Sequence, residues 1–485
     1  MKYFFGKSSR GLWLKYLILF LFVSPVFAQQ NQNTEASRRD VIRYGTETEI
    51  ASLIQSLRTE NADYLDEELI EVAQTSGNQR ILTGIFGFFG ERGKNGLEER
   101  AVKAINNRDY ETNETVHSAI EYLGRVKSSD AVPAIIDLLD TEERRFLNTG
   151  FRALGRAASA DRNSADTAAD FIIDFYNNRE PGQENQREML IAIGETGSAN
   201  GIELLSEIAT NEDERVPLRT AALEALSKIG NSKGLDAILS CVNTNDPNVR
   251  SAAVGALGPF SSGAVDSAIL EAFRDSFFRT RIAAAQASRD RRLAAAVPYL
   301  KFRAERDEVP NVRDEAIRAL GEIGSAEAVQ ALESLFSERR NSDRIRILAA
   351  DMLMKNASDE NYKKLLEEME EARRRNHTTL LNGLLRVAGE TILYGDKTDM
   401  ENLVRRFMQG TVVIERLYAL DMIANNNLTG FEAEINNMTQ DRNEGIARKA
   451  QRTLDILEEY KSGRRQRETQ RPAPRAQRQY DEENQ

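Results

Sequence analysis

The sequence predicts an all-α protein whose helices form a solenoid, that is, a superhelix of tandem antiparallel helix pairs. The 485 residues include only 10 prolines and 7% aromatic residues, a composition typical of helical proteins. Similar segments recur along the chain, and each contains two stretches with apolar residues three and four positions apart. A solenoid also explains the length, because it grows without enlarging a single core.

An arginine marks the repeat in the clearest region, residues 214–370. The five markers are Arg219, Arg250, Arg281, Arg313 and Arg346. They follow one another at steps of 31, 31, 32 and 33 residues. Less regular units of the same kind extend over residues 79–460, and we expect about 11 or 12 units in all.

The unit at residues 310–336 shows how one helix pair is built. Its apolar positions are Val312, Ala316, Ala319, Leu320, Ile323, Val329, Leu332, Leu335 and Phe336. They give each of two helices one apolar face, and Gly324 and Ser325 are expected to separate the helices. Pro133 and Pro298 are expected at the start of the second helix of their units. A single pair cannot bury such faces, so the pairs must stack.

Four strings carry a resemblance to a known family. They are "DPNVRSAAVGALG" at 246–258, "PNVRDEAIRALG" at 310–321, "AVPAIIDLL" at 131–139 and "AVQALESLF" at 328–336. The chain resembles HEAT-repeat proteins, in the short form also found in the phycobilisome-lyase HEAT-like group, as an exported bacterial member. The resemblance implies that the marker arginine contacts acidic or carbonyl groups of adjacent repeats.

The marker arginines are interpreted as structural, because a residue repeated in every unit usually maintains the unit. The alternative is a basic ladder for a polyanion. Asp246 precedes Arg250 by four residues, and Asp343 precedes Arg346 by three. Both spacings permit either a helical ion pair or a contact at the helix N-cap.

The first 28 residues are typical of an export signal. Positive charges at Lys2, Lys7, Arg10 and Lys15 accompany the short apolar run 16–23, and Val26 and Ala28 fit a cleavage site. The run is too short to span a bilayer, so we expect cleavage after Ala28 and no transmembrane segment afterwards. The pattern favours the bacterial periplasm over secretion.

The rest of the chain divides into a linker at 29–36, the solenoid at 37–460 and a tail at 461–485. The tail lacks apolar periodicity and is rich in arginine, so we expect it to be disordered. It either solvates the end of the chain or contacts an anionic surface through residues that include Arg464, Arg465 and Arg467. The cluster Arg373, Arg374 and Arg375 is a second candidate for an acidic partner, although alternating charges on a helix usually form a solvated face.

The residues that would support catalysis or metal binding are scarce. Cys241 is the only cysteine, so no intrachain disulfide forms, and it lies in an apolar run. Neither His117 nor His377 is followed by glutamate, unlike the iron-binding His-Glu pairs of HEAT-like deoxyhypusine hydroxylases. We therefore predict no catalytic residue, no metal site and no cofactor.

The charge of the chain argues against nucleic acid as a partner. The whole sequence has a net charge of −11, the leader contributes four positive charges and the tail a net three, so the body carries about −18. We therefore expect a non-enzymatic exported scaffold that binds other envelope proteins through a concave face formed by the second helices and the turns between helices. One alternative is a lyase-type enzyme or ligand carrier; another is polyanion or envelope-surface binding through the tail.

Overall fold

The computed structural model describes residues 35–60, 62–179, 181–355 and 357–462. These residues form α-helices joined by turns and short 3-10 segments, with no strand among them, which confirms the all-α prediction. The expected leader, residues 29–34 of the expected linker, and the tail beyond Ser462 lie outside the described residues. The chain divides into two compact units, unit 1 (Met1–Asn231) and unit 2 (Ser232–Gln485), which are considered separately.

The described part of unit 1 begins with a helix at residues 35–44, which includes the last two residues of the expected linker. The helices that follow are α2 (Glu47–Glu60), α3 (Asp66–Thr75), α4 (Gln79–Arg92), α5 (Glu98–Asn106), α6 (Asn113–Arg125), α7 (Val132–Asp140), α8 (Arg144–Ala158), α9 (Arg162–Asn178), α10 (Gln183–Thr196), α11 (Ile202–Thr210) and α12 (Val216–Ile229). Unit 2 contains α13 (Leu235–Cys241), α14 (Pro247–Ala256), α15 (Gly263–Ala272), α16 (Phe278–Asp290), α17 (Val297–Arg306), α18 (Pro310–Ile323), α19 (Ala326–Ser337), α20 (Asp343–Met354), α21 (Asp359–Arg374), α22 (Thr378–Glu390), α23 (Thr398–Gln409), α24 (Val413–Asn426), α25 (Glu432–Met438) and α26 (Glu444–Lys461).

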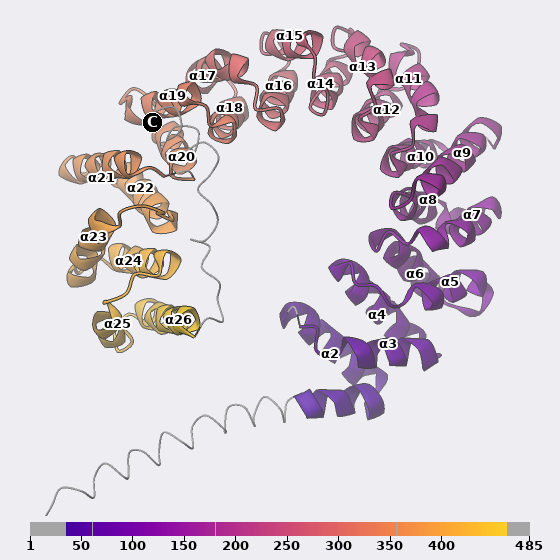
Figure 1. Cartoon of the computed structure of the whole chain (residues 1–485), viewed down its shortest axis with the longest axis horizontal. Coiled ribbons are helices and arrows are strands. Elements are labelled where there is room, and N and C mark those ends of the chain that lie inside the picture. Colours follow the sequence, from indigo (N-terminus) through magenta and orange to yellow (C-terminus); the bar gives the residue numbers. More distant parts are fainter. Residues whose placement is uncertain (1–34, 61, 180, 356, 463–485) are drawn as a thin grey trace, which may run out of the picture. The chain divides into compact units, whose positions relative to one another are not determined.

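The helices alternate along the chain between two layers. Each even-numbered helix is the first helix of a pair and the next odd-numbered helix is the second, giving twelve pairs in the described residues, from α2/α3 to α24/α25, followed by α26. Consecutive first helices pack directly against one another within each unit, and second helices pack against the first helix that follows them, as α5 does against α6 and α17 against α18. Figure 1 shows the two layers, and the expectation of tandem antiparallel helix pairs is confirmed.

The first helices lie on the inner side of the curve that each unit makes by itself (Figure 1). The expectation that the second helices line this side is therefore wrong. In unit 1, small residues in the first helices explain the result, because they allow these helices to approach closely. A Cβ atom on Gly155 of α8 would lie 2.5 Å from the carbonyl oxygen of Ala192 in α10, and one on Gly194 would lie 2.7 Å from the Cα of Ala225 in α12.

The predicted helix ends are confirmed where the local sequence determines them. The Asp246 side chain accepts hydrogen bonds from the N–H groups of the first turn of α14, which begins at Pro247. Gly324 ends α18 with a φ of 63°, and the Ser325 side chain caps α19. Pro133 occupies the first turn of α7, as Pro298 does in α17.

Two second helices are longer than their neighbours. The helix that carries the three consecutive arginines, α21, has 16 residues, whereas α19 and α23 have 12 each, as the sequence indicates. The polar segment 156–168 ends α8 and provides the first turns of α9, which has 17 residues. No helix in the described part of the chain has both the length and the apolar character that crossing a membrane requires.

Candidate interaction surface

Three marker arginines donate hydrogen bonds to the backbone of the turn that precedes their own helix. In each case Nη1 donates hydrogen bonds to the carbonyl groups six and five residues earlier in the chain. The oxygens belong to Thr244 and Asn245 for Arg250 (3.0 and 2.9 Å), to Asp275 and Ser276 for Arg281 (both 3.0 Å), and to Asp307 and Glu308 for Arg313 (2.6 and 3.5 Å). The guanidinium therefore satisfies backbone acceptors at the end of one repeat from the first helix of the next.

Two aspartates extend these contacts into a ladder. Asp275 accepts from Nε and Nη2 of Arg250 at 2.8 and 3.2 Å, and its own carbonyl accepts from Arg281. Asp307 accepts from Nε and Nη2 of Arg281 at 2.7 and 2.8 Å, and its carbonyl accepts from Arg313. We call the five residues Arg250, Asp275, Arg281, Asp307 and Arg313 the ladder. It runs through α14, α16 and α18 and links consecutive repeats.

The ion pair in the middle of the ladder is buried, and the ladder's hydrogen bonds shift the pKa values of groups within it. Arg281 and Asp307 are only 5% and 3% exposed. Burial raises the pKa of Asp307, but the hydrogen bonds from Arg281 and from the N–H of Val309 outweigh it, so this pKa lies below its usual value of 3.8. The pKa of Asp275 is also lowered, because Arg250 and the N–H of Phe277 outweigh the effect of burial. The hydrogen bond to Asp307 raises the pKa of Arg281.

The other two marker arginines make a different contact. Nε of Arg219 donates to the carbonyl of Ala209 at 3.0 Å, ten residues earlier. Arg346 does the same with the carbonyl of Phe336 at 2.8 Å, and its Nη2 reaches Glu368 of α21 at 2.5 Å. One sequence marker thus has two structural arrangements.

The acidic residues near the markers in sequence do not form the ion pairs that their spacing permits. Asp246 is the N-cap of α14, which is one of the two contacts considered, and Arg250 pairs with Asp275 instead. Asp343 is the first residue of α20 and lies 2.9 Å from Nε2 of His377 rather than beside Arg346.

The three consecutive arginines of α21 do not form one surface. Arg373 donates to Glu415 of α24 and lies over the ring of Phe407, so it connects neighbouring repeats. Arg375 pairs with Glu371 one turn earlier at 2.7 Å. Arg374 is exposed. The candidate tail residues Arg464, Arg465 and Arg467 lie outside the described residues.

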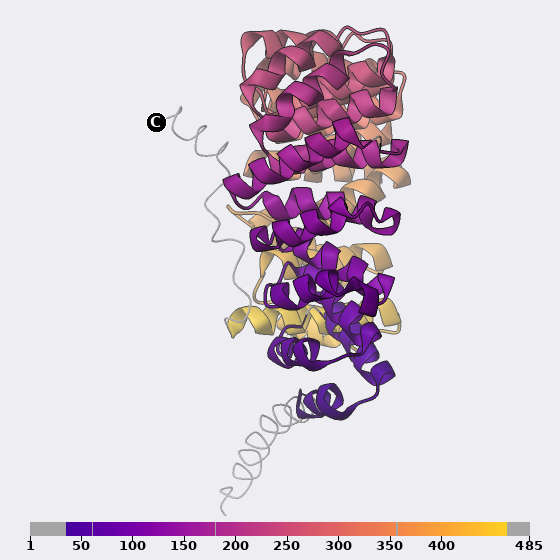
Figure 2. The same cartoon turned by 90° about the vertical axis from the view of Figure 1, so that its right-hand side faces the viewer.

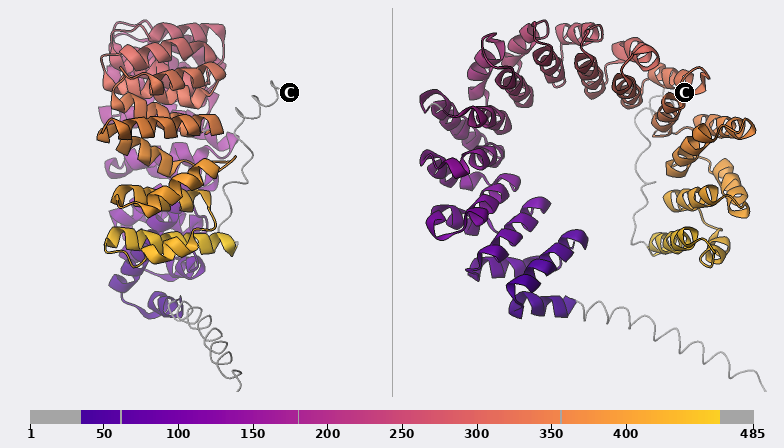
Figure 3. Two further views of the ribbon diagram at one scale, coloured as in Figure 1. Left: turned by 90° about the vertical axis from the view of Figure 1, so that its left-hand side faces the viewer. Right: turned by 180° about the vertical axis from the view of Figure 1, so that it is seen from behind.

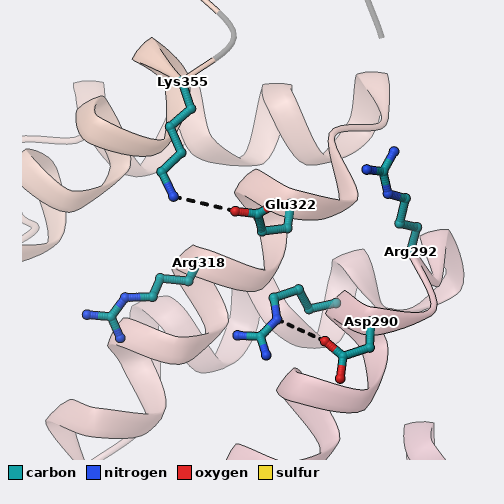
Figure 4. A pocket seen from close by; sticks show the side chains of 6 residues that line it. Asp290, Arg292, Arg318, Glu322 and Lys355 are labelled. Carbon is teal, nitrogen blue, oxygen red and sulfur yellow. Dashed lines mark hydrogen bonds and ion pairs between the residues drawn. The ribbon is translucent and has the colours of Figure 1, made fainter. Parts of the chain in front are cut away.

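A concavity of about 360 Å³ lies at the C-terminal ends of three first helices, α16, α18 and α20 (Figure 4). Its lining residues are Arg289, Asp290, Arg292, Arg318, Glu322 and Lys355. It contains two ion pairs: Lys355 Nζ lies 3.4 Å from Glu322 Oε1, and Arg289 Nε lies 3.1 Å from Asp290 Oδ1. Because its charges are of both signs and partly paired, the concavity is suited to polar protein side chains.

The exposed side of the first helices differs from repeat to repeat. The residues five positions after the five markers are Glu224, Gly255, Gln286, Arg318 and Asp351. None of the five is buried, and no two are the same residue type. The buried contacts thus repeat while the surface above them changes in charge and size.

The described residues show no arrangement typical of a metal centre. No group of three or more histidine, cysteine, aspartate or glutamate residues in this part of the chain could hold a metal ion. His117 contacts the hydroxyl of Thr149 at 3.1 Å and the ring of Phe146, and Cys241 is buried.

The sequence interpretation missed the two aspartates of the ladder. A signal was present, because "RD" precedes the marker in both "FRDSFFRTR" and "ERDEVPNVR", which places Asp275 and Asp307 six residues before Arg281 and Arg313. Helical spacing does not indicate these contacts, because it concerns side chains within one helix only.

Tandem helix pairs with directly packed first helices define an α-solenoid of the HEAT type. The sequence matches the family described as "Spirochaete HEAT repeat protein" over residues 42–453, and the chain belongs to this family. The HEAT-repeat resemblance is therefore confirmed. Solenoids of this type bind protein partners, commonly serve as interaction scaffolds and are generally non-catalytic.

Solved structures with a similar arrangement of helices share little sequence with this chain. They include Kap121p, with 11% identity over 87% of this chain and 53% of Kap121p at a TM-score of 0.42. Importin beta has 12% identity over 93% of this chain and 73% of its own, at a TM-score of 0.36. An engineered protein has 17% identity over 81% of this chain and 98% of its own, at a TM-score of 0.28. This chain thus spans about half of Kap121p, and no curated protein matches its sequence.

Proposed function

We propose that this protein is an exported, non-enzymatic scaffold that binds other proteins of the bacterial envelope through the exposed side of its first helices. Export is inferred from the basic and apolar leader with small residues at Val26 and Ala28. The non-enzymatic role is inferred from the sequence, which offers one cysteine, two isolated histidines and no recognisable catalytic motif.

The observation that carries the proposal is the contrast between the ladder and the surface above it. Arg250, Arg281 and Arg313 repeat the same backbone contacts in successive repeats. The residues five positions after these markers are Gly255, Gln286 and Arg318, which differ in size and charge. A stack that is held together independently of its surface can vary that surface to fit a partner, which is how repeat scaffolds acquire specificity.

Crosslinking followed by affinity isolation from native envelopes tests the scaffold role. The full chain should recover one or more protein partners, and Arg318→Ala combined with Asp351→Ala should weaken that recovery. Lys301→Ala combined with Asp236→Ala is the matched control, because it removes one cation and one acid from second helices. Recovery of no protein by the unaltered chain contradicts the proposal, and so does equal loss with the control pair.

The export proposal has a separate test. The chain isolated from the periplasmic fraction should begin at Gln29, the residue after the expected cleavage position. A full-length chain that stays in the cytoplasmic fraction would contradict it.

A further inference from the structure

One edge of unit 2 carries an excess of unpaired positive charge. The first helices of a unit run parallel to one another, so the turns that lead from each second helix to the next first helix lie along one edge (Figure 2, Figure 3). Five of these turns, or the helix ends beside them, contain an exposed arginine whose side chain has no hydrogen bond or ion pair with any described residue. We call these residues the edge arginines: Arg279, Arg306, Arg340, Arg374 and Arg442.

The other charges along this edge do not cancel the edge arginines. Glu271 pairs with Arg274, Glu371 with Arg339 and Arg375, and Asp314 with Arg344. Asp275 and Asp307 belong to the ladder. Glu305, Glu308, Glu338 and Glu444 lie there without an ion pair to a described residue, and they are fewer than the five edge arginines.

The same edge exposes apolar side chains. Val412, Val413 and Ile414 form a continuous run in the turn before α24 and its first residues, with exposures of 48%, 41% and 37%. This turn is the one between Arg374 and Arg442 that lacks an edge arginine, since its Arg405 and Arg406 lie near Glu401 and Glu370. Three consecutive exposed β-branched residues are unusual on a protein surface that contacts only water. Phe302, which is 55% exposed, lies one helical turn before Arg306.

We propose that this edge of unit 2 binds an anionic lipid surface. The edge arginines would donate to headgroup phosphates, which match the planar guanidinium, while Val412, Val413 and Ile414 enter the interfacial layer. The arginines occur about one to a repeat along a line and do not converge on a cavity, so they suit an extended anionic surface better than a small ligand. An acidic peptide would account for the arginines alone, whereas a lipid surface accounts for the aliphatic run as well.

The corresponding edge of unit 1 differs in the sign of its charge. Its exposed acids without an ion pair among the described residues include Asp109, Glu114, Glu184, Glu212 and Asp213, and they outnumber the exposed arginine without a partner there, Arg144. The lipid-binding property is therefore assigned to unit 2 only. It is independent of the scaffold proposal, because membrane attachment and protein binding would use different surfaces.

Sedimentation with vesicles provides the main test. The full chain should bind vesicles of mixed phosphatidylglycerol and phosphatidylcholine and should bind pure phosphatidylcholine much more weakly. Arg306→Gln, Arg340→Gln and Arg374→Gln together should lower partitioning onto the anionic vesicles roughly 10- to 100-fold, given the attraction of each basic residue to such a surface. The fold should survive, because none of the three side chains has a partner to lose.

The matched control removes the same charge elsewhere. Lys103→Gln, Lys127→Gln and Arg292→Gln alter three exposed cations that have no ion pair among the described residues and lie off this edge. Partitioning should then change about twofold or less. The arginine-rich tail is unchanged in both triple variants, so the difference between them reports on the edge. Equal loss in the two variants would overturn the proposal.

A single tryptophan tests whether the aliphatic run enters the lipid. Trp13 is the only tryptophan, so the chain without residues 1–28 has none. Val413→Trp in that chain should show a blue-shifted emission on anionic vesicles, and Tyr394→Trp, which replaces an exposed residue beyond the opposite end of α22, should not. Absence of any shift at position 413, or displacement of the chain by polyglutamate without a shift, would reject the lipid in favour of an acidic protein.

Failure of this inference is distinguishable from failure of the scaffold proposal. If the edge variant loses vesicle binding but still recovers protein partners, both hold. If the unaltered chain recovers partners but ignores anionic vesicles, only the lipid inference falls. If it binds vesicles and recovers no protein, only the scaffold proposal falls.

Discussion

Unit 1 and unit 2 are built from the same repeat, but they hold consecutive first helices together differently. In unit 1, glycines of one first helix meet alanines of the next, and a Cβ on the glycine would lie within 2.9 Å of the alanine. The pairs are Gly124 with Ala153, Gly155 with Ala192, and Gly194 with Ala225. In unit 2, the ladder connects α14, α16 and α18 through buried hydrogen bonds.

The glycines in the first helices of unit 2 do not meet the backbone of a neighbouring first helix. Gly255 of α14 has no atom within 4 Å of a Cβ placed on it, and Gly258 has none nearer than 3.7 Å. A Cβ atom on Gly321, Gly383 or Gly389 would instead meet a side chain of a neighbouring first helix, that of Met352, Ile347 or Tyr418, at 2.9, 2.2 and 2.6 Å. The repeat sequence therefore specifies the helix pair, while the junction between pairs can be fixed either sterically or by polar groups.

The largest expected effect comes from breaking the polar junction at its most buried point. Arg281→Ala leaves Asp307 as a buried carboxylate without its partner, which should lower the free energy of unfolding of unit 2 by about 3–5 kcal/mol. Denaturation combined with hydrogen exchange of α16 and α18 would measure this loss. Arg250→Ala should act in the same direction with a smaller loss, because Arg250 is more exposed, and should leave partner specificity intact.

The control for this prediction lies two residues away. Arg279→Ala removes an exposed arginine that contacts only the rings of Phe277 and Phe278, so the stability should change by about 0.5 kcal/mol or less. Comparable losses for Arg279→Ala and Arg281→Ala would show that the ladder contributes little. If Arg250→Ala lost partner binding but kept an unchanged melting curve, Arg250 would be a binding residue rather than a structural one.

The steric junction of unit 1 should be broken by a single methyl group. In Gly155→Ala the new Cβ would lie 2.5 Å from the carbonyl oxygen of Ala192 and 2.9 Å from its Cα, so the backbones of α8 and α10 must separate. We expect a loss of about 1–3 kcal/mol, typical of overpacking, in the unfolding of unit 1. A variant as stable as the unaltered chain would mean that this junction is not close-packed.

Acid distinguishes the two kinds of junction. The pKa values of Asp275 and Asp307 lie below 3.8 in the folded chain, so their contribution is complete above about pH 4 and is lost as the pH falls through the lowered values. The protons bind the unfolded chain first, and the stability of unit 2 should therefore decrease with falling pH in that range. The stability of unit 2 should decrease less steeply with falling pH in Asp307→Asn. An identical pH dependence in that variant would contradict the contribution assigned to Asp307.

The sequence predicted the features that depend on local residues and missed those that depend on stacking. Gly324, Pro133 and Asp246 set helix ends through their own backbone or side-chain chemistry, so their roles were predictable. The partner of Arg281 is 26 residues away, and only the packed repeats bring Asp307 within reach. The inner position of the first helices depends on distances between helices, which the apolar pattern of one helix does not contain.

The smallest expected effect has the opposite sign. Gly255 lies inside α14, and a Cβ at this position meets open space, so Gly255→Ala should stabilise unit 2 by about 0.5–1 kcal/mol through the higher helix propensity of alanine. The same substitution at Gly155 should destabilise unit 1. Thermal melts of the two single variants would show whether one melting temperature rises and the other falls. A destabilising Gly255→Ala would contradict the open space that the structure shows around this exposed position.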